Sequence, residues 1–344
     1  IIPDGVICIG DLAFYRCKRL TSVVIPDGVE LIGAFAFNGC SNLTDITFPK
    51  RVTYIGVDAF DECEGLKDEN GFIILDEILC KYFGEDDVVT IPEGVTTINS
   101  GAFKYCSNLT SITISDSVTT IGDRAFYECS NLTKITIPDK VTTIGYSAFG
   151  KCSGLTSIII PYGVKRIESC TFEKCSNLTS VSIPNSVTYI DDYAFGGCSS
   201  LTDITIPDGV DSMGEAVFAE CISLTSVTLP DSLTSIVERM FYECESLTSI
   251  TIPESVTSIG NSAFESCKNL ININIPAGVT YIGDCAFWNC FSLRDVTIPE
   301  SVKYIGDGVF WNCGDIDNVN NMNRETVSEY SKYEVTATDH LNLM

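Results

Sequence analysis

The sequence has almost none of the residues on which enzyme catalysis most often depends. Its 344 residues include a single histidine, His340, in an irregular C-terminal segment. A Ser-His-Asp or Cys-His arrangement therefore cannot be built from the regular part of the chain. The sequence also has no G-x-x-x-x-G-K phosphate-binding motif and no dinucleotide-binding glycine motif. We therefore expect a protein that is not an enzyme and has no cofactor.

Basic residues and long apolar runs are also scarce. The 21 Lys and Arg residues are outnumbered by 46 Asp and Glu residues, which gives a net charge of −25. A chain this acidic is a poor partner for nucleic acid. No apolar run reaches the roughly 18 residues that a membrane-spanning helix needs, so we expect no membrane span in this segment. The acidic residues do not form a D-x-D-x-D-G calcium loop, and we expect no metal site.

Cysteine, by contrast, is abundant, and its spacing predicts the architecture. Thirteen of the 17 cysteines follow one another at intervals of 23 residues, with a single interval of 43. A phenylalanine precedes each of them by three residues, and a leucine follows each of the first twelve by three. A period of this length indicates a solenoid, in which each coil packs only on its neighbours. The column consists of Cys17, Cys40, Cys63, Cys106, Cys129, Cys152, Cys175, Cys198, Cys221, Cys244, Cys267, Cys290 and Cys313.

Residues 129–151 illustrate the repeat, C-S-N-L-T-S-I-T-I-P-D-S-V-T-S-I-G-x-x-A-F-x-x. Alternating Ile and Thr at 135–137 predict a short strand, and Pro138 ends it because proline cannot donate to a ladder. V-T-x-I-G is a second extended piece, and x-x-A-F-x-x-C suits one turn of 3₁₀ or α-helix. Because helical turns are wider than strands, the stack should curve. We predict an α/β repeat solenoid: a curved, right-handed leucine-rich-repeat horseshoe with a parallel sheet on its concave side.

The unit C-x-x-L-x-x-I-x-I-P-x-x-V-x-x-I-G-x-x-A-F-x-x resembles the treponemal-type leucine-rich repeat of BspA-like bacterial surface proteins, over about residues 1–313. This resemblance implies a cell-surface or secreted location and a non-enzymatic adhesion module that binds host or matrix proteins or glycans. The repeat columns encode the scaffold and not the ligand, whose identity they leave open. The alternative is a structural spacer that displays another domain absent from this fragment.

Two segments depart from the repeat. The 43-residue interval contains an insert at 67–91, in which two apolar runs flank Asp76-Glu77. This pattern predicts a β-hairpin, either packed on the flank of the solenoid or contacting a ligand as a flap. The repeat fades after residue 313, and residues 314–344 are expected to form a half-coil, a cap or a linker tail.

The N-terminus begins inside a coil, at Ile2-Pro3, without an initiator methionine or a signal peptide. We therefore expect a fragment or a processed form.

The column cysteines are expected to be buried, reduced and equivalent to small hydrophobic residues. Their Cβ vectors would be nearly parallel, and thirteen is an odd number, so intercoil disulfides are disfavoured. Cys8, Cys80, Cys170 and Cys285 lie outside the column, and none forms a C-x-x-C pair that would suit zinc.

Two surfaces are candidates for binding. The outward positions of the first strand form a field of hydroxyls, which is either a weak, avidity-driven binding surface or simply a polar strand face. Exposed aromatic side chains are the stronger candidates, because Trp and Tyr dominate binding hot spots. The two tryptophans and Phe291 would form an exposed patch unless the C-terminal segment covers them. The candidate residues are Trp288, Phe291, Trp311, Tyr281, Tyr304, Thr113, Thr136, Thr205, Thr228 and Thr251.

Overall fold

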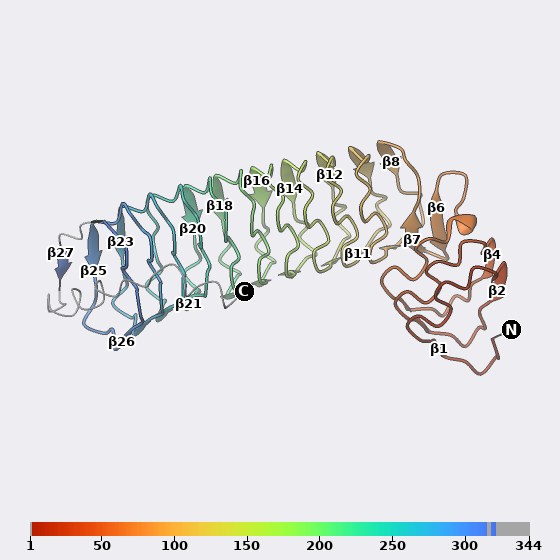
Figure 1. Cartoon of the computed structure of the whole chain (residues 1–344), viewed down its shortest axis with the longest axis horizontal. Helices are drawn as coiled ribbons and strands as arrows, with labels where there is room; N and C mark the ends of the chain where they lie inside the picture. Colours follow the sequence, from red (N-terminus) through yellow and green to blue (C-terminus); the bar gives the residue numbers. More distant parts are fainter. Residues whose placement is uncertain (1, 315–317, 321–344) are drawn as a thin grey trace, which may run out of the picture. The chain divides into compact units, whose positions relative to one another are not determined.

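The computed structural model describes residues 2–314 and 318–320. The chain divides into two compact units, Ile1–Val187 and Thr188–Met344. Each unit is a stack of parallel coils that follow the 23-residue repeat, as seen for β8, β12, β14 and β16 in the first unit (Figure 1). The solenoid predicted from the period is therefore confirmed.

The regular coils contribute two short strands each, except the coil of Thr251, which has only the second. The first strand comes from the L-T-x-I-T-I segment: β2 (Ser22–Val24), β4 (Asp45–Thr47), β8 (Val88–Thr90), β10 (Ser111–Thr113), β12 (Lys134–Thr136), β14 (Ser157–Ile159) and β16 (Ser180–Ser182) in the first unit, and β18 (Asp203–Thr205), β20 (Ser226–Thr228), β23 (Asn272–Asn274), β25 (Asp295–Thr297) and β27 (Asn318–Asn320) in the second.

The second strand comes from V-T-x-I: β1 (Cys8–Ile9), β3 (Leu31–Ile32), β5 (Tyr54–Ile55), β9 (Thr97–Ile98), β11 (Thr120–Ile121), β13 (Thr143–Ile144) and β15 (Arg166–Ile167) in the first unit, and β17 (Tyr189–Ile190), β19 (Ser212–Met213), β21 (Ser235–Ile236), β22 (Ser258–Ile259), β24 (Tyr281–Ile282) and β26 (Tyr304–Ile305) in the second.

The strands pair in parallel, with equivalent residues of successive coils side by side. In β10 and β12, Ile112 pairs with Ile135 and Thr113 with Thr136, a shift of one repeat. The central isoleucines are buried and the flanking residues of β12 are exposed. The alternation that predicted strands therefore also sets which side chains enter the core.

The core of each unit is built around stacked phenylalanine rings. Phe149 is fully buried, and its ring centroid lies 5.3 Å from that of Phe126 and 5.6 Å from that of Phe172, with the planes nearly parallel. Phe241, Phe264 and other column rings stack in the same way in the second unit. This confirms that the Phe column occupies the centre of each coil.

The A-F segment forms hydrogen-bonded turns, and the expectation of a helical turn is wrong for nearly all coils. Among the described residues, only η1 (Glu64–Leu66) is helical. Ser147 and Lys151 have left-handed φ values of 51° and 59°, which interrupt a helix after each half-turn. As a result, the N–H groups of Ser147, Phe149 and Lys151 donate to carbonyls of the next coil, whereas a helix would satisfy them within the coil.

The glycine that ends each V-T-x-I-G segment is required by close packing. At Gly145, a Cβ atom would lie 2.4 Å from Oδ1 and 2.6 Å from the backbone nitrogen of Asp123 in the preceding coil. Asp123 Oδ1 in turn accepts a hydrogen bond of 2.8 Å from the Tyr146 N–H. Glycine thus lets one coil approach the next closely enough for this side chain to cap its corner.

The insert contains an antiparallel pair, β6 (Phe72–Leu75) and β7 (Ile78–Tyr82), but it does not pack on the flank of the stack. Strand β7 pairs in parallel with β9, so it continues the ladder of second strands (Figure 1). The Tyr82 ring lies 5.2 Å from Phe103 and takes the place of a column phenylalanine. The flank-packing expectation is wrong because the hairpin supplies the same strand and ring that a regular coil would supply.

An ion pair helps to join this insert to the coil before it. Lys81 Nζ lies 2.9 Å from Asp61 Oδ1 and donates to the Gly101 carbonyl. Ile73, Leu75 and Cys80 pack into the core of the N-terminal coils.

The predicted limits of the solenoid (1–313) and of the C-terminal segment (314–344) remain predictions, because most of the latter lies outside the described residues.

The column cysteines are free thiols that donate hydrogen bonds along the stack. Cys152 Sγ lies 3.0 Å from the carbonyl oxygen of Phe126, which also accepts the Cys129 N–H. The same thiol-to-carbonyl contact recurs from Cys40 in the first unit to Cys290 in the second. The expectation of burial is confirmed for most of the column, although Cys17 at the first coil is exposed, and the reduced state stays a prediction.

Replacing Phe149 by alanine is expected to lower the free energy of unfolding by roughly 3–5 kcal/mol, because it removes a fully buried ring and leaves a cavity. Each coil contacts only its neighbours, so hydrogen exchange should increase most in the adjacent coils. Chemical denaturation and hydrogen-exchange mass spectrometry measure both effects. The control Tyr162→Ala removes a ring that is 71% exposed, and an equal loss in the two variants would contradict the stacked core.

Cysteine labelling should separate the exposed thiols from the column. In the native protein, Cys8 and Cys17 are exposed and are expected to react with iodoacetamide within minutes, whereas buried thiols such as Cys152 and Cys244 should be labelled only after denaturation. Peptide mapping by mass spectrometry gives the order of labelling. Disulfide-linked peptides from neighbouring coils would refute the reduced column.

Stability is expected to fall at alkaline pH. An unfolded thiol ionises near its ordinary pKa of 9.0, whereas burial raises the pKa of Cys63, Cys175 and Cys221 to about 12. Between these values the folded state keeps protons that the unfolded state has lost, so the free energy of unfolding decreases as pH rises from 9 towards about 12. At about pH 10, each such thiol should contribute a loss on the order of 1 kcal/mol.

Denaturant unfolding at neutral pH and at about pH 10 measures this loss. The variant Cys175→Ala should show a smaller pH-dependent decrease than the parent protein. An identical decrease in both proteins would mean that other groups cause it.

Candidate functional site

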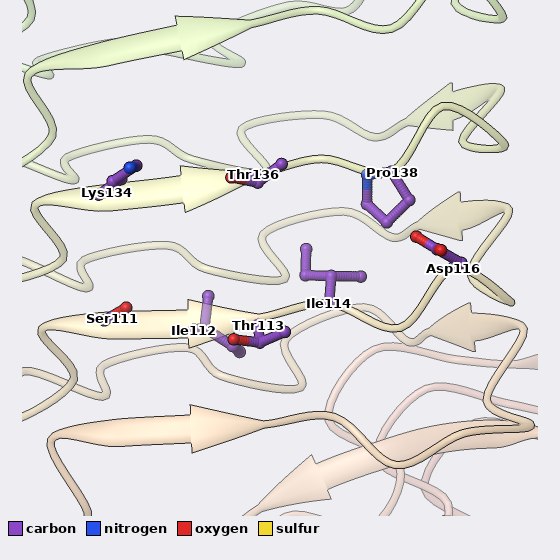
Figure 2. Close-up of a pocket in the computed structure, with 8 residues that line it drawn as sticks. All are labelled: Ser111, Ile112, Thr113, Ile114, Asp116, Lys134, Thr136 and Pro138. Atoms are coloured by element: carbon purple, nitrogen blue, oxygen red, sulfur yellow. The ribbon is translucent and has the colours of Figure 1, made fainter.

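The first-strand face, which comprises the outward side chains of the first strands, is hollowed between β10 and β12. The hollow has a volume of about 390 Å³. Figure 2 shows Ser111 and Thr113 on one strand facing Lys134 and Thr136 on the next, with Asp116 and Pro138 at the strand ends. The lining residues are Ser111, Ile112, Thr113, Ile114, Asp116, Lys134, Thr136 and Pro138.

The threonine hydroxyls of this hollow differ in their hydrogen bonding from those of the threonines that directly precede each first strand. Thr133 Oγ1 donates to the Thr110 carbonyl at 3.2 Å, so it is used within the scaffold. The hydroxyls of Thr113 and Thr136 are exposed and make no hydrogen bond within residues 2–314. They can therefore bond to a polar ligand, with Lys134 and Asp116 providing one charge of each sign. The hollow contains no histidine, cysteine or paired carboxylates that would support catalysis.

The remaining candidate threonines lie in the second unit. Thr205 and Thr228 are exposed and directly paired on β18 and β20, whereas Thr251 is exposed in a coil without an assigned first strand. The first-strand face is less uniform than a hydroxyl field, because Asp203 and Asp295 are exposed on it in this unit.

The candidate tyrosines form one close pair. Tyr281 and Tyr304 are exposed on β24 and β26, and their rings stack with centroids 4.8 Å apart. The negative charge of Asp284 is the main cause of a raised pKa at Tyr304. The same repeat column also contains Tyr54, which lies in the first unit, and Tyr189, which is half-buried.

The two tryptophans also pair, and they are neither fully exposed nor fully buried. Their ring centroids lie 4.4 Å apart, and both residues are half-buried on the turn side of neighbouring coils. Trp288 packs over Gly308, where a Cβ atom would come within 3.0 Å of the indole ring. Phe291, in the turn after Cys290, is 43% exposed. The proposed cover by the C-terminal segment, and His340 within it, lie outside the described residues.

Column-based sequence reasoning missed a second group of aromatic residues, in the first unit. Tyr105, Tyr127 and Tyr146 lie in three neighbouring coils but in three different columns of the repeat, so the period does not bring them together. The tertiary structure does, with cationic side chains over each ring. The local excess of lysine and arginine in these coils was a signal that could have indicated them.

Within the described part of the chain, no group of three or more His, Cys, Asp and Glu residues is placed to hold a metal ion. None of the helical segments there is long and apolar enough to cross a bilayer.

Comparison with known proteins agrees with the repeat geometry. A solved leucine-rich repeat protein from Bacteroides ovatus is 31% identical over 96% of this chain and 86% of its own length, with a TM-score of 0.62. A leucine rich cell surface protein from Faecalibacterium prausnitzii is 35% identical over 85% of this chain and 82% of its own, with a TM-score of 0.49. A leucine-rich repeat protein from Eubacterium ventriosum, 22% identical over 93% of this chain and 84% of its own with a TM-score of 0.54, shares the fold.

The search of curated proteins gives no match. A family model described as the BspA type leucine rich repeat region (6 copies) matches residues 1–79, 80–202 and 188–317. These matches span most of the chain, and this chain belongs to the BspA-type leucine-rich repeat family.

Proposed function

We propose that this chain is a non-enzymatic binding module of a bacterial cell surface, which attaches to host or matrix proteins or to glycans. The family supports an interaction role, since its repeats build a rigid scaffold with large side faces. The hollow on the first-strand face lacks the groups needed for acid–base or nucleophilic chemistry.

The aromatic surface in the second unit is the main candidate contact. We define it as Trp288, Phe291, Trp311, Tyr281 and Tyr304, on the turns and second strands of neighbouring coils. The observation that carries this choice is the pairing of both tryptophans at 4.4 Å while part of each remains accessible. A ring already held by its neighbour loses little conformational entropy on binding, and Trp and Tyr are the residues most often dominant in interfaces.

The first-strand face is the second candidate contact. Thr113 and Thr136 have hydroxyls free to bond to a ligand, and Thr205, Thr228 and Thr251 expose the same group in the second unit. Single hydroxyl contacts are weak, so this face would contribute through several simultaneous contacts with a repetitive ligand.

A structural spacer is the alternative function. A repeat scaffold can hold another domain at a distance without binding anything itself. It would then bind none of the candidate ligands.

Binding to immobilised extracellular-matrix proteins and to a glycan array tests the proposal. For any ligand found, we expect the double variant Phe291→Ala and Trp311→Ala to lower affinity at least tenfold, about 1.4 kcal/mol. Because Trp288 and Trp311 are the only tryptophans, ligand binding should also shift the emission of the parent protein.

The matched control is Tyr54→Ala, which removes an aromatic ring that is 55% exposed in the other unit. Its affinity should stay within twofold of the parent protein. Ligand binding that survives the double variant would exclude the aromatic surface as the site, and absence of binding to every ligand would favour the spacer.

A further inference from the structure

Four coils of the first unit differ in charge from the rest of the chain. Residues 101–187 contain eight Lys and Arg residues against six Asp and Glu residues, a net charge of +2. The remaining residues contain 13 basic and 40 acidic side chains, a net charge of −27. A locally basic surface is therefore set between strongly acidic segments of the sequence.

Within these coils, three tyrosines and three cations form one cluster. We define the tyrosine–cation cluster as Lys104, Tyr105, Arg124, Tyr127, Tyr146 and Lys151. The coils' turns hold it in place, because the Tyr105 N–H donates to the Tyr127 carbonyl and the Arg124 N–H donates to the Tyr146 carbonyl, each at 2.8 Å. The turns that carry these residues come directly after β9, β11 and β13. They therefore lie in the part of the stack between β8 and β14 (Figure 1).

Arg124 links the rings of the cluster. Its guanidinium carbon lies 5.2 Å from the centroid of the Tyr146 ring and 5.9 Å from that of Tyr127. Tyr105 meets Tyr127 edge to face at 6.0 Å. Lys151 Nζ lies 5.0 Å from the Tyr127 ring, and Lys104 Nζ lies 4.9 Å from that of Tyr105. These distances suit cation–π attraction, which fixes the orientation of each side chain.

The three cations differ in their counterions. Lys151 Nζ lies 2.9 Å from Glu128 Oε1, and Lys104 Nζ lies 3.3 Å from Asp58 Oδ2. No carboxylate of residues 2–314 lies within 4.0 Å of the Arg124 guanidinium. A hydrogen bond to Tyr146 is the main cause of a raised pKa at Arg124. Arg124 is thus a charged side chain held by tyrosines and open to an anion.

The cluster is accessible to a partner. Arg124 is exposed, and Tyr105 and Tyr146 are 57% and 40% exposed. Tyr and Arg are the residues most enriched at the centres of protein interfaces, where buried rings exclude water around a charged hydrogen bond. The planar guanidinium binds a carboxylate through two parallel hydrogen bonds, which gives both energy and orientation.

We propose that the tyrosine–cation cluster is a docking surface for an acidic segment of a partner protein, with Arg124 binding a carboxylate and the tyrosines covering the adjoining backbone. This inference rests on the proposed function as a binding module. The cluster, however, lies in the first unit, whereas the tryptophans lie in the second. A long, dense polyanion such as a sulfated glycan fits less well. The segments before and after residues 101–187 together carry a net charge of −27, which would repel the parts of a polyanion that extend beyond the cluster.

The test uses a fluorescein-labelled decaglutamate peptide and fluorescence anisotropy with the full chain. We expect saturable binding that weakens with added salt, and an affinity lowered about tenfold by Arg124→Gln. Arg124→Lys should restore only part of the loss, because lysine keeps the charge but not the paired hydrogen bonds. The matched control Arg51→Gln removes an exposed arginine outside the cluster and changes net charge equally, so its affinity should stay within twofold of the parent protein.

Three outcomes would overturn the proposal. One is absence of decaglutamate binding. Another is an equal loss in Arg124→Gln and Arg51→Gln, which would mean binding by net charge alone. The third is Arg124-dependent binding of a hyaluronan oligosaccharide or heparin in place of the peptide, which would identify a glycan site. The first two leave the matrix-protein and glycan-array result with the Phe291 and Trp311 variants unaffected, and in the third the bound glycan depends on Arg124 in place of Phe291 and Trp311, so failure here is distinguishable from failure of the proposed function.

Discussion

The turns of each coil depend on the next coil for their hydrogen bonds. Ser147, Phe149 and Lys151 donate their N–H groups along the stack, and the intervening residues donate back within the turn. This alternation requires left-handed φ values at Ser147 and Lys151, which a lone turn of these residues would not favour. The stack stabilises the conformation because each turn supplies the acceptors of its neighbour.

The same dependence explains the least variable columns of the repeat. A Cβ at Gly145 would collide with the preceding coil, so the separation of the coils leaves no space for a side chain there. The phenylalanine rings stack at 5.3–5.6 Å, close to the spacing of the strands. The thiol of Cys152 donates to the Phe126 carbonyl, and burial raises the pKa of this thiol, which favours the neutral form that keeps the proton. Even the insert obeys this rule, since Tyr82 extends the ring stack and β7 extends the strand ladder.

Because stacking uses the buried columns, the exposed columns are free to differ between coils, and the proposed binding surfaces lie in those exposed columns. The tryptophan pair joins two successive coils in one column, at positions 288 and 311, so its contact follows directly from the repeat. The tyrosine–cation cluster joins three coils through four columns: Lys104 shares the column of Tyr127 and Lys151 that of Tyr105, whereas Arg124 and Tyr146 occupy separate columns. Its assembly depends on side-chain directions in the turns as well as on the period.

The sequence alone determined the coil period, the two strands per coil, the buried Phe, Leu and Cys columns and the hairpin residues, since periodic burial leaves a direct pattern in the residue types. It also placed Trp288 beside Trp311 and Tyr281 beside Tyr304, because residues one period apart lie on adjacent coils. Only the tertiary structure decided that the A-F segment forms turns, because left-handed φ values at residues such as Lys151 depend on acceptors in the next coil. It alone decided that β7 enters the ladder and that Arg124 lies among tyrosines, because both depend on contacts between residues that the repeat does not align.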